Sequence, residues 1–431
     1  MQADSSVSQS TNPTSPQRGA ATETMRDASG ALYPGWSTSI ASMIGLTVGP
    51  SCILVFCFGS FVVPLQKEFN WGIGAISFGA TIISIMIVIT AILSGFLADR
   101  IGGRKLVLVS LPLFAAGVAS LYFLTPSITV FYVALIVISL LGVGVWPGPY
   151  NKLTAGWFDR RLGFSLGVAN TGIGLGAILL PAVLGYVIPA YGWRQGYLVL
   201  GLLALIAWPF AFAMLKERGH STASRTRALP ALQVDMSFPE ARRTREFWLA
   251  LGGFFALGAA SSGVVVHLVR ILVDTGMTPP QAAGMQAVLG AALLVGRLGT
   301  GWLLDHIRAS ALMAVLCLLG AIALVGLAMG APGGSAWLCA AAVGLVVGAE
   351  FDVLSFLIPR YFGRRSFGVL YGVIFAVFQI GAAVSIGLLG ALRGQSGTYG
   401  PGLTAVAVLL VVSSALFLAF GTYRNPARRP S

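Results

Sequence analysis

Apolar runs of about twenty residues recur along almost the whole chain, and they constrain its fold more than any other feature. A helix needs about 20 mostly apolar residues to cross the ~30 Å hydrocarbon core of a bilayer. Twelve such runs can be placed, each to within a few residues, near 39–65, 72–98, 105–124, 128–151, 163–188, 195–215, 247–273, 280–304, 309–330, 334–358, 366–390 and 400–421. The sequence therefore predicts an all-α membrane protein with twelve transmembrane helices.

The composition agrees with a chain that faces lipid. Of the 431 residues, 56% are hydrophobic and 10% are charged, whereas soluble domains carry about 25% charged residues. A surface with so little charge must contact something other than water. We therefore exclude an ordinary soluble protein and expect the lipid bilayer as a partner.

The longest polar interruption, residues 216–246, separates the first six runs from the last six. We expect an N-terminal six-helix bundle over 39–215, a C-terminal six-helix bundle over 247–421, and a central cytoplasmic loop between them. Residues 1–38 are rich in Ser, Thr, Gln and Ala and lack the apolar core of a secretory signal, which predicts a disordered cytoplasmic tail. Residues 422–431 form a second, shorter tail.

Positive charge is distributed unevenly among the loops. If the amino terminus is cytoplasmic, 22 of the 27 Lys and Arg residues lie in the tails and inner loops. The others are Lys67, Arg194, Arg270 and Arg393 near outer ends and Arg297 within a span. The positive-inside rule then predicts a multi-pass protein of the cell (inner) membrane with both termini in the cytoplasm. Since the rule accounts for the net charge of +13, we expect no nucleic acid as a partner.

Two short motifs occur twice at nearly one spacing. Residues 95–101 (GFLADRI) are matched by 301–307 (GWLLDHI), 206 residues later, and residues 157–161 (WFDRR) by 361–365 (YFGRR), 204 residues later. Both pairs fall at equivalent loops of the two predicted bundles. The sequence therefore indicates a duplicated six-helix unit, an organisation typical of secondary transporters.

These motifs also resemble a known family. GFLADRIGGRK at 95–105 resembles the signature loop between helices 2 and 3 of the major facilitator superfamily, and GWLLDHI at 301–307 resembles its degenerate second copy. Residues 64–77, 157–176 and 360–372 resemble the monocarboxylate and oxalate/formate transporter branch. The resemblance implies two pseudo-symmetric six-helix bundles that alternate access to a substrate site between them.

The chain departs from that branch at positions that bear on the substrate. Monocarboxylate carriers typically place an Asp four residues before the arginine of helix 8, and here that position is Leu293. The lysine often found within helix 1 and the helix 11 lysine of the oxalate exchanger pattern are both missing. These departures leave the expected transport fold unchanged.

Three charged residues, Arg297, Glu350 and Asp352, fall near the middle of predicted spans. A lone charge at that depth costs roughly 3 kcal/mol, so each should face a cavity or a partner. A guanidinium can hold a carboxylate through two hydrogen bonds, and we predict that Arg297 binds an anionic substrate. The alternative is a structural pair between Arg297 and Glu350 or Asp352.

Glu350 and Asp352 are two residues apart and so point about 200° from each other on a helix. One should face the cavity and the other should pack against neighbouring helices. A desolvated carboxylate can carry a proton near neutral pH, which makes both of them candidates for proton coupling, together with His267. The alternatives are a static link between helices 8 and 10 and a hydrogen-bonded histidine among helices.

Other polar residues on the predicted spans are candidates for substrate binding or, alternatively, for helix packing. They are Tyr150, Asn151, Asn170, Gln286 and Gln379. Acidic and basic residues at inner helix ends are candidates for a gate that holds the outward-facing state, or else for solvated topology signals. They are Asp99, Arg100, Arg104 and Asp305. Two small-xxx-small pairs on helix 5, Gly163 with Gly167 and Gly172 with Gly176, predict close helix contacts.

Motifs for enzymatic chemistry are missing from the sequence. It contains no GxxxxGK[ST] loop and no metal-ligand spacing, so we expect no enzyme, no metal and no cofactor. The predicted function is secondary active transport of a small organic anion, a monocarboxylate or aromatic carboxylate, by proton symport or anion exchange, in a monomer. The alternatives are a carrier for a neutral or cationic compound such as a vitamin or drug, and a non-transporting membrane sensor on the same fold.

Overall fold

A computed structural model describes residues 33–218, 235–330, 333–421 and 423, and within them twelve helices are long and apolar enough to cross a membrane. The first half of the chain contains α2 (Pro34–Thr47), a π-helix (Ser51–Phe56), α3 (Phe58–Phe69), α4 (Ile73–Ile101), α5 (Gly103–Ser120), α6 (Ile128–Leu141), α7 (Pro147–Ala155), α8 (Leu162–Tyr191) and α9 (Trp193–Met214). The second contains α11 (Phe238–Ala241), α12 (Arg245–Asp274), α13 (Pro279–Leu304), α14 (Ala309–Ala328), α15 (Gly333–Tyr361), α16 (Phe367–Ser396) and α17 (Gly400–Leu418). The tail predicted at 1–38 lies outside the described residues as far as residue 32, and α2 begins at Pro34. Of the tail predicted at 422–431, the structure describes Tyr423 alone. Residues 219–234 of the predicted central loop also lie outside the described residues.

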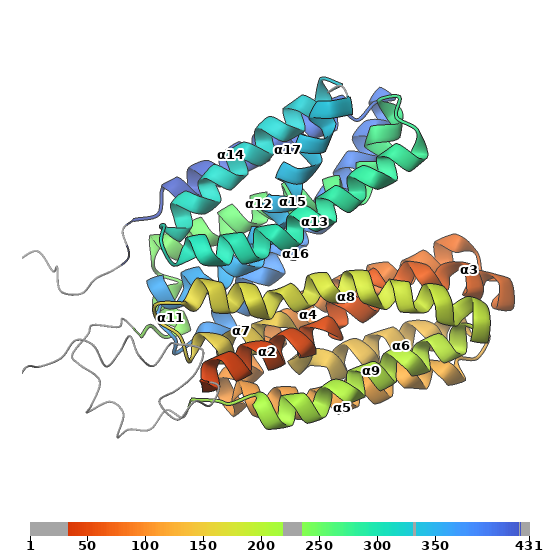
Figure 1. The fold of residues 1–431 in the computed structure, drawn as a ribbon, viewed down its shortest axis with the longest axis horizontal. Coiled ribbons are helices and arrows are strands. Elements are labelled where there is room, and N and C mark those ends of the chain that lie inside the picture. The colour runs from red at the N-terminus through yellow and green to blue at the C-terminus, as the bar shows by residue number, and fades with distance from the viewer. Residues whose placement is uncertain (1–32, 219–234, 331–332, 422, 424–431) are drawn as a thin grey trace, which may run out of the picture.

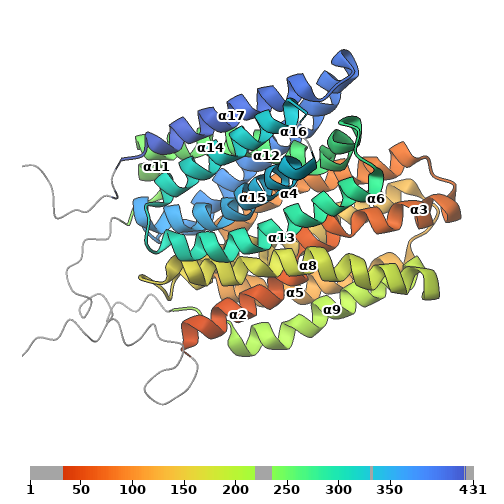
Figure 2. The ribbon, with the colours of Figure 1, turned by 45° about the horizontal axis from the view of Figure 1, so that its top comes forward.

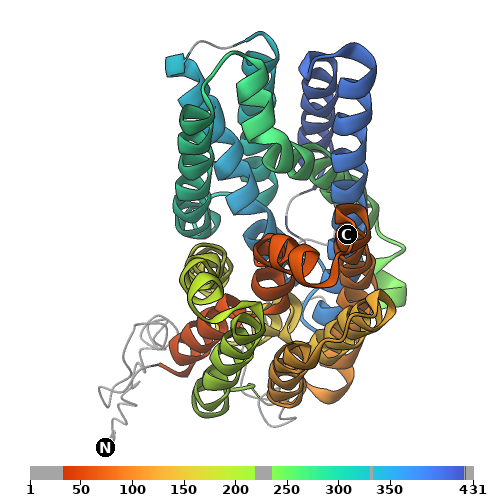
Figure 3. The same cartoon turned by 90° about the vertical axis from the view of Figure 1, so that its right-hand side faces the viewer.

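The helices form two bundles, which we call the N-half (α2–α9) and the C-half (α12–α17). Figure 1 shows the bundles close together at the end where α11 lies and apart at the other end. Figure 2 shows α13 of the C-half alongside α8 of the N-half. Seen from the end where they are apart, the C-half lies above the N-half (Figure 3). The predicted all-α fold of two six-helix bundles is confirmed.

Two of the spans are interrupted where proline occurs. Span one consists of α2, a turn at Val48 and Gly49, Pro50 in a helical conformation, and a π-helix from Ser51 to Phe56. Span four changes from α6 to a 3-10 helix at 142–145, then to an extended residue, Trp146, and α7 begins at Pro147. Proline has no N–H to donate and clashes with the preceding turn, so span four is broken where Pro147 and Pro149 occur.

The halves contact each other through α4 against α16 and α8 against α13. At Gly95 of α4, an added Cβ would lie 2.0 Å from the carbonyl oxygen of Gly368 of α16. At Gly163 of α8, it would lie 2.3 Å from the carbonyl oxygen of Gly301 of α13. The backbones therefore touch near the α11 end of the bundles, which we call the closed end; we call the opposite end the open end.

The close contacts predicted for helix 5 are confirmed on both sides of α8. The first pair, Gly163 and Gly167, faces α13 of the other half. The second pair faces α2 of the same half, where a Cβ at Gly172 would lie 2.1 Å from the carbonyl oxygen of Met43. Small residues let transmembrane helices approach this closely, so α8 joins its own bundle to the other one.

Candidate functional site

A cavity of about 390 Å³ lies between the two halves. Its wall combines spans one, two, four and five of the N-half with α12, α13, α15 and α16 of the C-half. The lining residues run from Ala80 to Ile87 on α4 and from Ser261 to Val266 on α12. Both stretches belong to the part of the helix nearer the open end, so the cavity occupies the open-end half of the molecule.

The lining side chains differ sharply in exposure along the cavity. Arg297 and Glu350 are 2% and 4% exposed, whereas Phe56 and Val266 are 48% and 60% exposed. The first two lie near the middle of α13 and α15, and the last two lie toward the open end. The cavity is therefore a deep one, with its two charged groups at the buried floor.

Arg297 is held on α13 between two packed helices. A Cβ at Gly167 of α8 would lie 2.7 Å from its carbonyl oxygen, and a Cβ at Gly348 of α15 would lie 3.2 Å from its backbone nitrogen. Its guanidinium carbon lies 5.4 Å from the centre of the Phe351 ring, a cation–π distance. Among the described residues, Nε and Nη1 of Arg297 have no hydrogen-bond partner. The floor of the cavity thus carries a buried cation with free donors.

Glu350 and Asp352 lie on different sides of α15. Glu350 lines the cavity, and its Oε2 is buried without a hydrogen-bond partner among the described residues. Asp352 is fully buried and is absent from the lining; its Oδ1 accepts a hydrogen bond of 2.7 Å from Nδ2 of Asn170 on α8. One carboxylate therefore faces the cavity and the other joins the two halves.

A buried polar layer connects the halves around Asp352. Besides Asn170, it contains Asn151 of α7, whose Nδ2 donates to Oγ of Ser355 on α15 at 2.8 Å. Tyr150 is also fully buried, and its hydroxyl has no partner among the described residues. Tyr150, Asn151 and Asn170 do not line the cavity. In this state Asn151 and Asn170 hold the halves together, whereas the Tyr150 ring packs against Gly45 of α2 in its own half.

The other predicted polar residues lie at separate places. Gln379 of α16 lines the cavity. Gln286 of α13 does not, and its Oε1 is buried without a partner in the described structure. His267 of α12 lies near the open end, where Nδ1 is 3.2 Å from the hydroxyl of Tyr399 and Nε2 is 3.3 Å from the carbonyl oxygen of Ile386.

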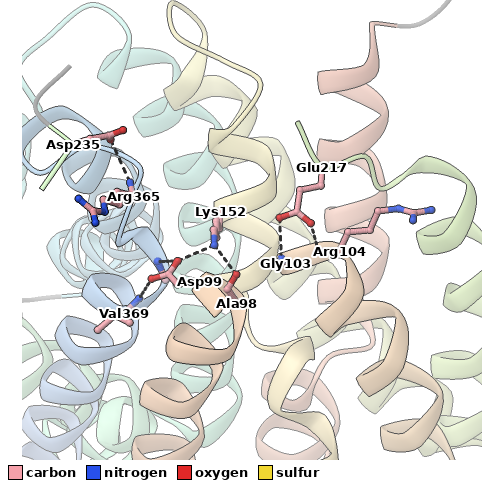
Figure 4. Close-up of polar contacts among 10 residues, drawn as sticks. Ala98, Asp99, Gly103, Arg104, Lys152, Glu217, Asp235, Arg365 and Val369 are labelled. Carbon is pink, nitrogen blue, oxygen red and sulfur yellow. Dashed lines mark hydrogen bonds and ion pairs between the residues drawn. The ribbon is translucent and has the colours of Figure 1, made fainter. Parts of the chain in front are cut away.

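Asp99 lies at the closed end, where α4 meets the start of α16 (Figure 4). Its Oδ1 accepts from the backbone nitrogen of Gly368 at 2.9 Å, and its Oδ2 accepts from that of Val369 at 2.8 Å. Lys152 of α7 pairs with the same carboxylate at 2.8 Å. A carboxylate is stabilised at a helix N-terminus by the unpaired N–H groups and the helix dipole, so Asp99 ties the N-half to the C-half.

Asp305 makes the equivalent contact in the opposite direction. It follows α13 and accepts from the backbone nitrogens of Gly163 at 2.7 Å and Phe164 at 3.0 Å, at the start of α8. The two copies of the repeated motif therefore each close one helix pair across the interface.

The two arginines predicted beside Asp99 make other contacts. Nε of Arg104 donates to the carbonyl oxygen of Leu215 at 2.7 Å. Its backbone nitrogen donates to Glu217 at 3.2 Å (Figure 4), and both acceptors follow α9. The side chain of Arg100 is exposed. Within the described ranges, Asp99 and Asp305 are the two of the four predicted gate residues that bond across the interface.

Sequence reasoning gave no role to the arginines that complete the closed end. Nη2 of Arg364 donates to the carbonyl oxygen of Phe158 at 2.8 Å and to Oδ1 of Asp159 at 2.6 Å. Nη2 of Arg360 donates to the carbonyl oxygen of Asp159 at 2.6 Å. The repeated WFDRR and YFGRR motifs were the available signal, because the Arg364 bonds join one copy to the other and Arg360 directly precedes the second copy.

Comparison with known proteins agrees with this arrangement. Residues 44–386 match the family described as Major Facilitator Superfamily. The chain belongs to the major facilitator superfamily. Monocarboxylate transporter 13 of Bos taurus is 26% identical over 386 residues, which cover 86% of this chain and 87% of that protein. The proton:xylose symporter XylE has the same fold, with a TM-score of 0.69 and 15% identity over 90% of this chain and 96% of its own.

This member of the superfamily is thus a multi-pass membrane transporter. Human organic anion transporter MFSD10 shares the fold as well, with a TM-score of 0.66 and 15% identity over 89% of this chain and 99% of its own. Transporters of the superfamily bind substrate between repeats near the bilayer midplane, and the cavity with Arg297 and Glu350 at its floor is likewise lined by both halves.

Proposed function

We propose that this transporter carries a small organic anion, a monocarboxylate or aromatic carboxylate, by alternating access. The observation that carries the proposal is the buried guanidinium of Arg297, whose Nε and Nη1 lack partners among the described residues. An unpaired buried charge is costly, and a substrate carboxylate would supply two acceptors in the geometry that the guanidinium fits. Relatives named monocarboxylate transporters support the same substrate class.

We propose that Glu350 and Asp352 couple this transport to protons, with His267 as a further titratable group. Glu350 shares the cavity with Arg297, so a bound anion that neutralises the arginine would favour protonation of the nearby carboxylate. Release of that proton and of the anion on the other side would complete a symport cycle. Anion exchange is the alternative, in which the site changes from one side of the membrane to the other only while an anion is bound to Arg297.

Further residues are proposed to contact the substrate during the cycle. Gln379 would do so in the present state, because it lines the cavity. Asn151 and Asn170 bond across the interface between the halves, and they, together with the buried Tyr150, would reach the substrate when the closed end opens. Gln286, eleven residues before Arg297 on α13, would lie on its path toward the open end.

We propose a place in the cell (inner) membrane, as a monomer, with both termini and the central loop in the cytoplasm. The closed end would then be cytoplasmic and the cavity would open outward. In that orientation Asp99 and Asp305, with Arg100 and Arg104 beside them, would hold the outward-facing state until substrate binds.

The test is uptake of labelled carboxylates by proteoliposomes that contain the full chain. We expect Arg297→Ala to abolish uptake and Arg297→Lys to lower it at least about tenfold, because a lysine cannot make the bidentate contact. Glu350→Gln or Asp352→Asn should remove the pH dependence of carboxylate uptake and leave the exchange of one carboxylate for another intact. The matched control is Arg270→Ala, on the exposed open end of α12, which should leave uptake unchanged; anion uptake that survives Arg297→Ala rejects the proposal.

One observation favours a second candidate, a carrier for a neutral or cationic compound. Glu350 also faces the cavity with an oxygen that has no hydrogen-bond partner in the described part of the chain, and it could recognise a positive group. In that case Glu350→Gln would abolish binding and Arg297→Ala would not. A sensor would instead bind its ligand saturably without accumulation inside the vesicles.

A further inference from the structure

The cavity wall offers one positive group and one negative group. Among its described lining residues, Arg297 is the one cation and Glu350 the one anion. A second carboxylate on the substrate would find no cation and would face Glu350 or apolar side chains, which is unfavourable in a site with little water. The wall therefore selects a substrate with a single carboxylate.

A group of aromatic rings lies beside the guanidinium of Arg297. The Phe351 ring, 5.4 Å from the guanidinium carbon of Arg297, has its centre 5.4 Å from that of Phe375 and 5.9 Å from that of Phe378. All three rings line the cavity, and Trp146 lines it from the N-half. A carboxylate on Arg297 would direct the rest of its molecule into this group of rings, where a further ring can pack at centre distances of about 4.5–7 Å.

The wall is poor in groups that could bind hydroxyls. Its uncharged polar side chains, apart from the indole of Trp146, are four serines and Gln379, and one of these serines, Ser84, already donates to the carbonyl oxygen of Ala80 at 2.9 Å. A polyhydroxylated substrate would leave several hydroxyls unpaired. The volume of about 390 Å³ lies in the range of about 300–1,000 Å³ that is typical of sites for larger ligands, and it exceeds what a short-chain acid fills.

We infer that the preferred substrate is an aromatic monocarboxylate, with its carboxylate on Arg297 and its ring among Phe351, Phe375 and Phe378. The inference rests on the proposed function, from which it takes the role of Arg297, and it selects one substrate class within it. Short aliphatic acids, aromatic dicarboxylates and sugars are the classes that the wall disfavours.

The test is direct binding to the purified full chain in detergent, measured by calorimetry with phenylacetate, lactate, terephthalate and xylose. We expect phenylacetate to bind at least about tenfold more tightly than lactate, from the added apolar area that it buries. Terephthalate and xylose should bind more weakly than phenylacetate by a similar factor or not at all. The same order should hold for competition against labelled phenylacetate uptake.

Variants of the rings separate this inference from a general loss of structure. Phe378→Leu keeps apolar volume and removes the ring, so we expect an about 3- to 10-fold weaker affinity for phenylacetate and an affinity for lactate within about twofold of the unchanged protein. Phe375→Leu should behave alike. Phe210→Leu is the matched control, because Phe210 is exposed on α9 and lies outside the cavity wall, and it should change neither affinity.

The outcomes separate the aromatic preference from the proposed transport of an organic anion. If lactate binds as tightly as phenylacetate in an Arg297-dependent manner, or if Phe378→Leu weakens both acids equally, the aromatic preference is wrong and the proposed function stands. Terephthalate binding as tight as that of phenylacetate would also overturn the inference. If no carboxylate binds, or if binding survives Arg297→Ala, the proposed function fails together with the inference.

Discussion

Asp305 and Gly163 meet across the interface between the halves, with Oδ1 of the aspartate 2.7 Å from the backbone nitrogen of the glycine. Asp99 and Gly368 repeat this relationship at 2.9 Å with the halves exchanged. The first aspartate follows span eight and reaches span five, and the second ends span two and reaches span eleven. A duplicated sequence motif therefore produces two equivalent closures at one end of the molecule.

Removing the charge of Asp305 should open the closed end. We expect Asp305→Asn to shift the equilibrium between closed and open by about 1–2 kcal/mol, a factor of about 5–30, because a charge-assisted contact with a helix N-terminus becomes a neutral one. The measurement is the maleimide labelling rate of Ser355→Cys, a buried position between the halves; the four natural cysteines are buried. Asp274→Asn, within the C-half near the open end, is the control, and an unchanged rate in Asp305→Asn would argue against the latch.

A single methyl group should separate α8 from α13. The Cβ of Gly163→Ala would fall 2.3 Å from the carbonyl oxygen of Gly301, whereas at Gly185 of the same helix nothing lies within 4 Å. We expect Gly163→Ala to increase the labelling rate of Ser355→Cys and to lower transport at least about tenfold, since packed helices cannot absorb such an overlap without moving. Gly185→Ala should transport normally and unfold at an equal or slightly higher temperature; similar behaviour of the two variants would contradict the prediction.

Asn170 and Asp352 should be coupled energetically across the interface. Deleting either partner leaves a buried polar group unpaired, so the single variants Asn170→Ala and Asp352→Ala should each cost about 1–3 kcal/mol of the free energy of unfolding in detergent. The double variant should cost clearly less than their sum. Gln286→Ala, which removes a side chain outside this layer, should combine additively with Asp352→Ala. Additivity of the first pair would mean that their hydrogen bond contributes nothing.

The contact of Glu68 with Trp193 and Arg194 at the open end should persist at mildly acidic pH. Glu68 of α3, beyond the first candidate span, accepts hydrogen bonds from Trp193 and Arg194, and these, with the Trp193 bond the larger cause, lower the pKa of Glu68. A lowered pKa adds stability that is present above the ordinary value of about 4.3 and is lost as the pH falls through the lowered value. Glu68→Gln should therefore reduce the unfolding temperature equally at about pH 7 and about pH 5.5; a loss of this difference at the lower pH would contradict the assignment.

The number and order of spans could be predicted because lipid leaves a chain few choices. Every backbone group in the hydrocarbon must be hydrogen-bonded within its own segment, so length and apolar content suffice to place a helix. The breaks beside Pro50 and at Trp146 could not be predicted in the same way. A proline predicts a disturbance of the helix, but neighbouring helices decide whether the result is a bend, a π-helix or an extended residue.

The charged residues of the site show the same limit. Sequence spacing established that Glu350 and Asp352 point apart, and it could not tell which of them faces the cavity. That choice depends on how α15 is rotated against α8 and α13, where Gly348 packs on the backbone of Leu293 and Arg297. The rotation is set by contacts between residues far apart in the chain.

The amino-acid sequence by itself determined the twelve spans, the duplicated halves and the membership in a transporter family, since these follow from local composition and repeated motifs. Only the tertiary structure decided which polar groups meet. It sets Asn170 against Asp352, Asp99 against the start of α16, and Arg297 beside Phe351. Such pairings depend on how each helix is rotated and on distances of a few ångströms between helices. The hydrophobic periodicity of the sequence determines neither of these.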